Sequence, residues 1–187
     1  MIDLVNNPYQ IFDNSISIKL QDNIESWLTD GDNFAWFYNE TSIIEEDTNY
    51  GFESYDYAQF SHAFVLDYKT NSNAKSFVFD KLINEINVNN LVIRAKANLK
   101  LMCPYGHADS HNKPHYDQDT EHFVGLYYVN NSDGYTWLFN KDRTVMKRIE
   151  PRKGRFVFFR GDILHAASHP HKCKKRLVIN IDFQKEK

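Results

Sequence analysis

The feature that most constrains this fold is a change of pattern at residue 91, after which the sequence becomes a series of short β-rich runs. Turn residues separate these runs at intervals of roughly 8–12 residues, which is typical of a β-sandwich or barrel. Apolar and polar side chains alternate within the run over residues 91–103. The other candidate strands are residues 122–129, 135–139, 144–149, 155–160 and 175–183. The C-terminal half is therefore expected to form a β-barrel or jelly roll.

Residues 1–90 show helical periods and many aromatic side chains instead. A short helix capped by Asp22 is predicted from the apolar face that follows this residue. A longer amphipathic helix is predicted over residues 73–86. The aromatic stretch between them, residues 34–68, has no clean period, so irregular strands and a lid both stay open.

The length of 187 residues fits one domain, with a helical and aromatic layer over residues 1–90 and a β-rich core over residues 91–187, an α+β fold. Hydrophobic residues at 42% and charged residues at 25% exclude a collagen-like or disordered chain. No apolar run approaches the ~18 residues of a membrane helix, and no secretory signal is visible, so no membrane partner is expected. The two cysteines, Cys103 and Cys173, make no disulfide framework, and a cytoplasmic location is expected.

The charges are distributed unevenly along the chain. Residues 1–90 carry 15 acidic and 4 basic side chains, a net charge of −11, whereas residues 91–187 carry 10 acidic and 18 basic ones, a net charge of +8. Either the two halves attract each other within one domain, or the basic half surrounds a site for an anionic ligand. No RNA- or DNA-binding motif is present and the acidic half disfavours a phosphate backbone, so nucleic acid is not expected as a partner.

Histidines cluster beside carboxylates in the C-terminal half. Pro114 argues against a helix around His115 and Asp117, and in an extended segment side chains at i and i+2 point to the same side. His165, which lies 48 residues after Asp117, would supply a third ligand from a distant strand. Two histidines and one carboxylate with open positions suit non-haem Fe(II). A catalytic zinc ion with three protein ligands is also compatible with this set.

A second HxD pair, His107 and Asp109, has the same spacing. It lies beside Pro104 and Gly106 in a stretch that reads as a loop, whereas His115 runs toward a predicted strand. We therefore expect the pair at His115 to be the metal-binding one.

Arg176 opens the last predicted strand, eleven residues after His165. A guanidinium forms a planar fork that binds a carboxylate through two parallel hydrogen bonds. Alone, Arg176 could equally be one more surface cation in the basic run 172–176. Together with the three candidate ligands, it indicates a site for a carboxylate.

These residues resemble the Fe(II)/2-oxoglutarate-dependent dioxygenases, in particular the prolyl 4-hydroxylase-like branch, whose motif is HxD, a distant His and then an Arg or Lys. The tract FVGLYYVNNSDGYTWLF resembles the strand-turn-strand that follows HxD in this family, and DILHAASHPHKCKKRLVINIDF resembles its closing strands. The resemblance covers residues 91–184. The N-terminal half is similar to compact members encoded by bacterial viruses, for which the compartment would be the host cytoplasm.

The resemblance implies a double-stranded β-helix, a cupin-like barrel, with the N-terminal helices packed on one sheet. It also implies a role for individual residues. His115, Asp117 and His165 would bind Fe(II), and Arg176 would pair with the distal carboxylate of 2-oxoglutarate. The further donors to this carboxylate would be Tyr128, then Tyr105 and, as the weakest, Thr136.

The activity implied is hydroxylation of a substrate C–H by O2, with release of succinate and CO2; ascorbate is an optional addition to the cofactors. The favoured substrate is a prolyl residue of a peptide or protein. The alternatives are the same chemistry on a nucleobase, a free amino acid or a small metabolite, and a non-enzymatic cupin-type barrel that binds a metal or ligand. Most N-terminal aromatics are expected in the core or a lid, and the candidates for a substrate groove are Trp36, Phe37, Tyr38, Tyr55, Tyr57 and Phe60.

Overall fold

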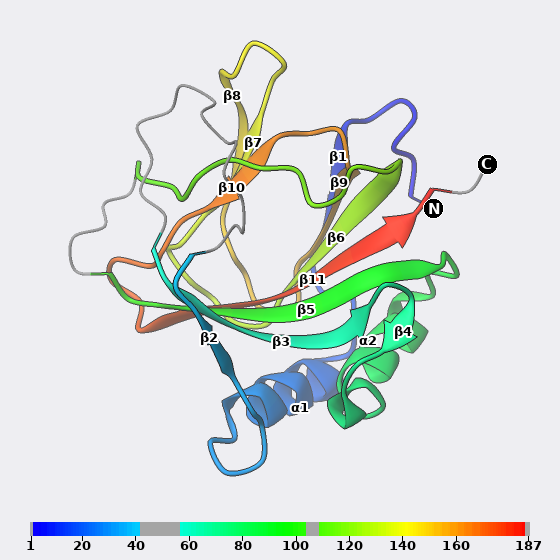
Figure 1. Cartoon of the computed structure of the whole chain (residues 1–187), viewed down its shortest axis with the longest axis vertical. Helices are drawn as coiled ribbons and strands as arrows, with labels where there is room; N and C mark the ends of the chain where they lie inside the picture. Colours follow the sequence, from blue (N-terminus) through cyan, green and yellow to red (C-terminus); the bar gives the residue numbers. More distant parts are fainter. Residues whose placement is uncertain (1, 42–56, 104–108, 186–187) are drawn as a thin grey trace.

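The computed structural model describes residues 2–41, 57–103 and 109–185. Two antiparallel sheets face each other, and two helices cover the outer side of the larger sheet (Figure 1). The elements are β1 (Tyr9–Phe12), α1 (Ile18–Thr29), β2 (Phe37–Asn39), β3 (Gln59–Leu66), β4 (Lys69–Thr70), a 3₁₀ turn (Asn73–Lys75), α2 (Phe79–Ile86), β5 (Val92–Leu101), β6 (His122–Tyr128), β7 (Thr136–Phe139), β8 (Val145–Ile149), β9 (Phe156–Arg160), β10 (His165–Ala167) and β11 (Lys175–Gln184).

The strand order identifies the architecture. The larger sheet runs β1-β9-β6-β11-β5-β3-β2, with β4 paired to β3, and the smaller sheet runs β10-β7-β8. An isolated antiparallel bridge between His115 and His165 adds one more segment to the edge of the smaller sheet. Facing sheets with this order form a double-stranded β-helix with helices on one sheet, which confirms the expected fold.

The strict alternation of the long strands separates two cores. In β11, Leu177, Ile179 and Ile181 point toward the helices, whereas Val178 points toward the smaller sheet and packs in the same cluster as Leu138. Because successive side chains of a strand point to opposite faces, one strand can serve both layers. The predicted faces of residues 91–103 and 175–183 are thus confirmed.

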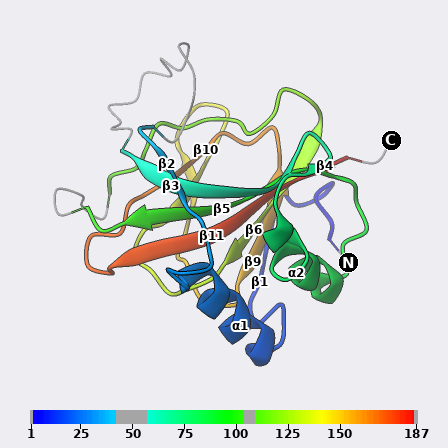
Figure 2. The same cartoon turned by 60° about the horizontal axis from the view of Figure 1, so that its bottom comes forward.

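Helices α1 and α2 pack beneath β5, β11 and β3 (Figure 2). Helix α1 starts at Ile18, after Ser17, so Asp22 lies inside it and the predicted cap is wrong. The apolar stripe begins one turn earlier than expected, at buried Leu20, and continues through Ile24. The Asp22 carboxylate instead accepts a hydrogen bond from Lys153 Nζ at 2.7 Å.

The predicted helix over residues 73–86 is two elements. A 3₁₀ turn over Asn73–Lys75 is capped by Ser72, whose Oγ accepts from the Ala74 amide at 3.1 Å. Helix α2 then begins at Phe79 and ends before Asn87, which has a left-handed φ of 53°. The described helices include none that is long and apolar enough to cross a membrane.

The N-terminal half supplies strands as well as helices. Strand β1 pairs with β9 at one edge of the larger sheet, and β3 pairs with β5 toward the other edge. The aromatic stretch at residues 34–68 therefore contains the strands β2 and β3. Its period was hidden because buried His62 sits among the apolar side chains of β3, with its ring nitrogens 2.7 Å from Ala35 O and from Ser72 Oγ.

Candidate active site

The three predicted metal ligands converge between the two sheets. The backbones of His115 and His165 exchange hydrogen bonds of 2.9 and 3.1 Å, which places the two imidazoles side by side with ring centroids 4.6 Å apart. Asp117 follows at i+2 on the same side, with Oδ2 3.2 Å from His165 Nε2 and Oδ1 4.0 Å from His115 Nε2. One candidate ligand atom from each residue lies within 4.8 Å of the others, a spacing that could hold a metal ion.

Backbone carbonyls fix how the two imidazoles face this centre. His115 Nδ1 lies 3.2 Å from Lys113 O, and His165 Nδ1 lies 3.2 Å from Ile163 O. A neutral imidazole that donates from Nδ1 keeps its lone pair on Nε2. Both Nε2 atoms lie toward Asp117, so the carbonyls select the tautomer that a metal requires.

The charge states of His115 and Asp117 suit metal binding as well. Burial, reinforced by repulsion from His165, lowers the pKa of His115 to about 4, so this imidazole is neutral near pH 7. Burial alone would raise the pKa of Asp117, but His165 and Arg94 hold it well below its usual range. Burial would lower the pKa of His165, but the carboxylate of Asp117 raises it. Asp117 is therefore an anion that attracts a cation to this site.

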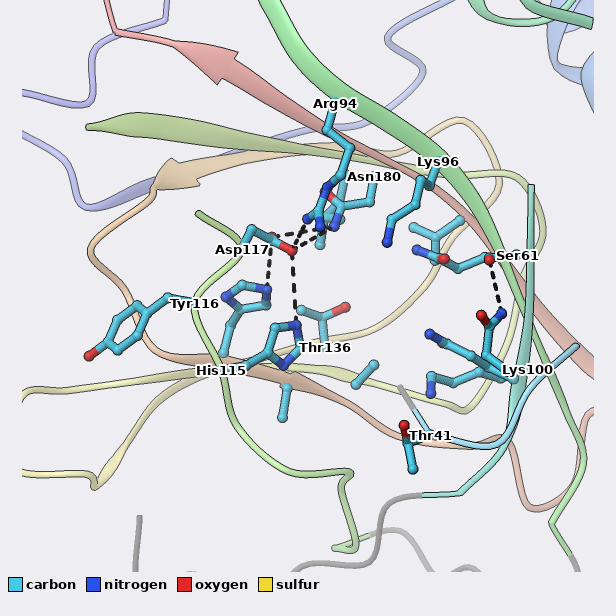
Figure 3. A pocket seen from close by; sticks show the side chains of 18 of the residues that line it. Thr41, Ser61, Arg94, Lys96, Lys100, His115, Tyr116, Asp117, Thr136 and Asn180 are labelled. Carbon is cyan, nitrogen blue, oxygen red and sulfur yellow. Dashed lines mark hydrogen bonds and ion pairs between the residues drawn. The ribbon is translucent and has the colours of Figure 1, made fainter. Parts of the chain in front are cut away.

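The larger sheet holds the Asp117 carboxylate in place (Figure 3). Arg94 on β5 binds one oxygen through Nη2, and Asn180 on β11 donates from Nδ2 to both oxygens at 3.3 Å. Arg94 Nε also binds Asp182 Oδ2 at 2.8 Å. Asp182 accepts in turn from Gln118 Nε2 at 2.7 Å. Hydrogen-bonded partners of this kind orient a ligating carboxylate before the metal arrives.

The triad opens into a cavity of ≈ 390 Å³ between the sheets. Arg176 lines its inner part and is only 3% exposed. The guanidinium donates to Gly134 O at 2.8 Å and to Thr136 Oγ1 at 2.7 Å. Thr136 also accepts from Tyr128 Oη at 2.7 Å. Thr136, which was expected to be the weakest donor, thus lines the cavity itself. Tyr128 lies in the buried core and contacts Thr136 from there.

One residue of the second HxD pair lies outside the described residues, and so do Tyr105 and Tyr55. Of that pair, His107 is outside and Asp109 is described. The Asp109 side chain is largely exposed and binds Arg148 Nη1 at 3.0 Å. Among the described residues, the one group of ligands close enough to share a metal is His115, Asp117 and His165.

Sequence reasoning missed the cavity wall formed by β5. Arg94, Lys96, Asn98 and Lys100 all line the cavity. The signal was present, because a strand that carries four polar side chains on one face needs a polar space for them. What the sequence did not show was that this face looks inward toward the triad rather than outward to solvent.

A double-stranded β-helix with two histidines and one carboxylate on one side of an open cavity defines a class of mononuclear, non-haem metal sites. The family comparison agrees with this class. Residues 101–184 match the model of the 2OG-Fe(II) oxygenase superfamily, which confirms the resemblance to this family over that part of the chain. Members of this family use Fe(II), 2-oxoglutarate and O2, and the donor set described above fits these cofactors.

Solved structures share the fold over nearly the whole chain. A 2OG-Fe(II) oxygenase family oxidoreductase from Burkholderia pseudomallei has a TM-score of 0.71 at 9% identity and covers 98% of this chain and 88% of its own. A prolyl-4-hydroxylase from Pseudomonas putida has a TM-score of 0.61 at 14% identity, with coverages of 99% and 96%.

A prolyl hydroxylase from Trichoplax adhaerens, in complex with a hypoxia inducible factor peptide fragment, has a TM-score of 0.61 at 14% identity, with coverages of 97% and 85%. At these identities the likeness shows the fold. No curated protein sequence matches the chain.

Proposed function

We propose that this oxygenase hydroxylates a C–H bond of a prolyl residue in a peptide or protein, with 2-oxoglutarate converted to succinate and CO2. The observation that carries the proposal is the placement of the metal triad and of a buried arginine in one cavity. Fe(II), when bound, supplies the redox chemistry with O2 and 2-oxoglutarate. The chain itself supplies ligands, orientation and a site that limits the access of water.

The metal-binding role falls to His115 and His165 through Nε2 and to Asp117 through its carboxylate. Three protein ligands leave further positions open for the cosubstrate and O2. Arg94 and Asn180 hold the Asp117 carboxylate in one orientation, so the metal would meet a preformed site.

Arg176 would bind the distal carboxylate of 2-oxoglutarate. Its guanidinium is buried, and no carboxylate among the described residues forms an ion pair with it. Burial lowers the pKa of Arg176, which reflects the cost of a charge removed from water. A buried cation without an anion is unfavourable, so the site is built for an anionic ligand that completes the pair.

Thr136 would be the second contact to this carboxylate. Its Oγ1 accepts from both Arg176 and Tyr128. With both of these donors directed at the oxygen, the hydroxyl proton of Thr136 is left for a further acceptor in the cavity. Tyr128 would therefore act through Thr136, and Tyr105 would remain an additional donor to the same carboxylate.

Two features support a peptide substrate. The prolyl hydroxylase from Trichoplax adhaerens shares the fold and was solved with a peptide. In addition, Phe37 and Tyr38 on β2 are each 62% exposed, directly before Asn39, which lines the cavity. We assign Phe37, which shares a strand face with Asn39, to a peptide groove. Tyr38 points to the opposite face of β2 and contacts Phe60, with ring centroids 5.7 Å apart. Trp36 packs against the core and donates from Nε1 to Leu28 O at 3.2 Å.

The first test needs no substrate. Anaerobic titration of the apoprotein with Fe(II) and then 2-oxoglutarate should give a visible metal-to-ligand charge-transfer band in the wild type and in His107→Ala, but not in His115→Ala. A panel of prolyl peptides should then yield a product heavier by one oxygen atom. A folded protein that binds the metal but gives no band would refute the dioxygenase, and a product on free amino acids alone would refute the peptide substrate.

A further inference from the structure

The polar face of β5 forms one wall of the cavity. In the antiparallel register of β5 and β11, Lys96 lies opposite Asn180 and Lys100 lies opposite Arg176. On its other side β5 pairs with β3, which adds Ser61 to the same wall. Figure 3 shows both lysines pointing into the cavity. This wall is therefore polar and cationic from the triad outward to β3.

The cations that line the cavity outnumber the described carboxylates there. The lining carboxylates among the described residues are Asp117 and Asp119, and Asp119 is exposed to solvent. Arg94 is neutralised by Asp117 and by Asp182. Lys96, by contrast, forms no ion pair with a carboxylate in the described part of the chain.

The position of Lys96 separates it from the 2-oxoglutarate contacts. Its cross-strand neighbour Asn180 donates to both oxygens of Asp117. Lys96 is therefore adjacent, on the next strand, to a residue that holds a candidate metal ligand. Arg176 lies four residues away from Asn180 on β11, which is ~13 Å along the strand. An anion at Lys96 would therefore lie near the metal and apart from the distal carboxylate of the cosubstrate.

The bound cosubstrate would not neutralise the charge of Lys96. The distal carboxylate of 2-oxoglutarate would neutralise Arg176, and the keto acid end would neutralise charge at the metal. Burial, and then repulsion from Arg94, lowers the pKa of Lys96, and the attraction of Asp117 and Asp182 offsets this only in part. An anion in contact with the ammonium group would favour its charged form further. A third carboxylate, one that belongs to neither the protein nor the cosubstrate, would complete the site.

Building on the proposed function, we infer that the substrate carries a carboxylate close to the oxidised C–H and that Lys96 binds this carboxylate. One ammonium group beside neutral amide and hydroxyl side chains matches a monoanion better than a phosphate dianion. In a peptide this carboxylate belongs to an Asp or Glu residue near the target proline. In a small substrate it is the α-carboxylate itself.

The experiment measures binding without turnover. The full chain, loaded anaerobically with Fe(II) and 2-oxoglutarate, is titrated by calorimetry with two pairs of probes. The first pair is N-acetyl-Ala-Pro-Glu amide and its Gln counterpart, and the second is N-acetylproline and N-acetylprolinamide. The variants are Lys96→Met and Lys96→Arg, with Lys147→Met, on the exposed face of β8, as the matched control.

The acidic member of at least one pair should bind about tenfold or more tightly, since a charge-assisted hydrogen bond of this kind is worth at least that factor. The preference should vanish in Lys96→Met and persist in Lys96→Arg and Lys147→Met. A preference in the peptide pair assigns the carboxylate to a neighbouring side chain, and a preference in the proline pair assigns it to a small substrate.

Two results would overturn the inference: no charge preference in the wild type, including no binding of any probe, or a preference that survives in Lys96→Met. Loss of the charge-transfer band in Lys96→Met alone would show that Lys96 supports the cofactor site and would overturn it as well. Absence of that band in the wild type would instead contradict the proposed function.

Discussion

Arg176→Met should separate cosubstrate binding from the stability of the fold. Methionine has a similar length but no charge, and it removes the hydrogen bonds of 2.8 and 2.7 Å to Gly134 O and Thr136 Oγ1. Two hydrogen bonds from a charged donor contribute ~3–6 kcal/mol together. The desolvation of an unpaired buried cation opposes them by several kcal/mol. We therefore expect the free energy of unfolding of the cofactor-free protein to change by less than about 2 kcal/mol.

The complex with 2-oxoglutarate should respond very differently. Removing one partner of a buried, hydrogen-bonded charge pair costs about 2–5 kcal/mol, so the Kd for 2-oxoglutarate should rise by roughly thirtyfold or more. The assay is anaerobic titration of the Fe(II)-loaded protein, followed through the charge-transfer band, beside urea unfolding of the cofactor-free protein.

The control is Arg160→Met, which removes an arginine from a surface pair with Asp162. It should leave the Kd within about twofold of the wild-type value. A Kd for Arg176→Met within the same range would refute the role assigned to Arg176. If Arg176→Met unfolded completely, the estimate that the two opposing energies nearly cancel would be wrong.

Three further results are expected. His115→Ala should weaken metal binding at least about a hundredfold in a calorimetric Fe(II) titration, because one of three protein ligands is lost, and His107→Ala should not; equal loss in both would contradict the assignment of the triad. Gly125→Ala should lower the free energy of unfolding by ~1–3 kcal/mol, since its Cβ would lie 2.8 and 2.9 Å from two phenylalanine rings of the core, and an unchanged urea midpoint would speak against this packing. Burial, and then repulsion from Lys100, lowers the pKa of His169 to about 4, so the unfolded chain binds this proton first and stability should fall by up to about 3 kcal/mol as the pH drops from about 6.5 to 4; His169→Gln should flatten that part of the curve, and an unchanged slope would show that other groups dominate it.

The β-barrel half could be predicted from the sequence because its strands alternate cleanly. Each of Leu177, Ile179 and Ile181 faces the helices, and Arg176 and Asn180 face the cavity. A period of two fixes such faces locally, without knowledge of the neighbouring strands. The same local rule placed His115 and Asp117 on one side of an extended segment.

What the sequence could not give depends on contacts between distant segments. Arg94 reads as one polar residue of an alternating strand. Its pairing with Asp182 follows from the register of β5 and β11, and its pairing with Asp117 from the position of the segment that carries His115. The start of α1 was misplaced because Leu20 ends a run of alternating apolar residues, Ile16, Ile18 and Leu20, and its burial in the helix is set by the sheet against which α1 packs. That Thr136 rather than Tyr128 lines the cavity beside Arg176 likewise depends on the packing of distant segments.

The bridge between His115 and His165 has a consequence for the folding of the chain. The segment that carries His115 and Asp117 is joined to β10 by a few backbone hydrogen bonds, which include one from the Asn112 amide to Ala167 O at 2.9 Å. A metal held by ligands 48 residues apart would act as a cross-link that closes a long loop, and such a link removes conformations from the unfolded chain. Loading with metal should therefore slow hydrogen exchange in this segment and raise its resistance to proteases, so the supply of iron would set the lifetime of the protein as well as its activity.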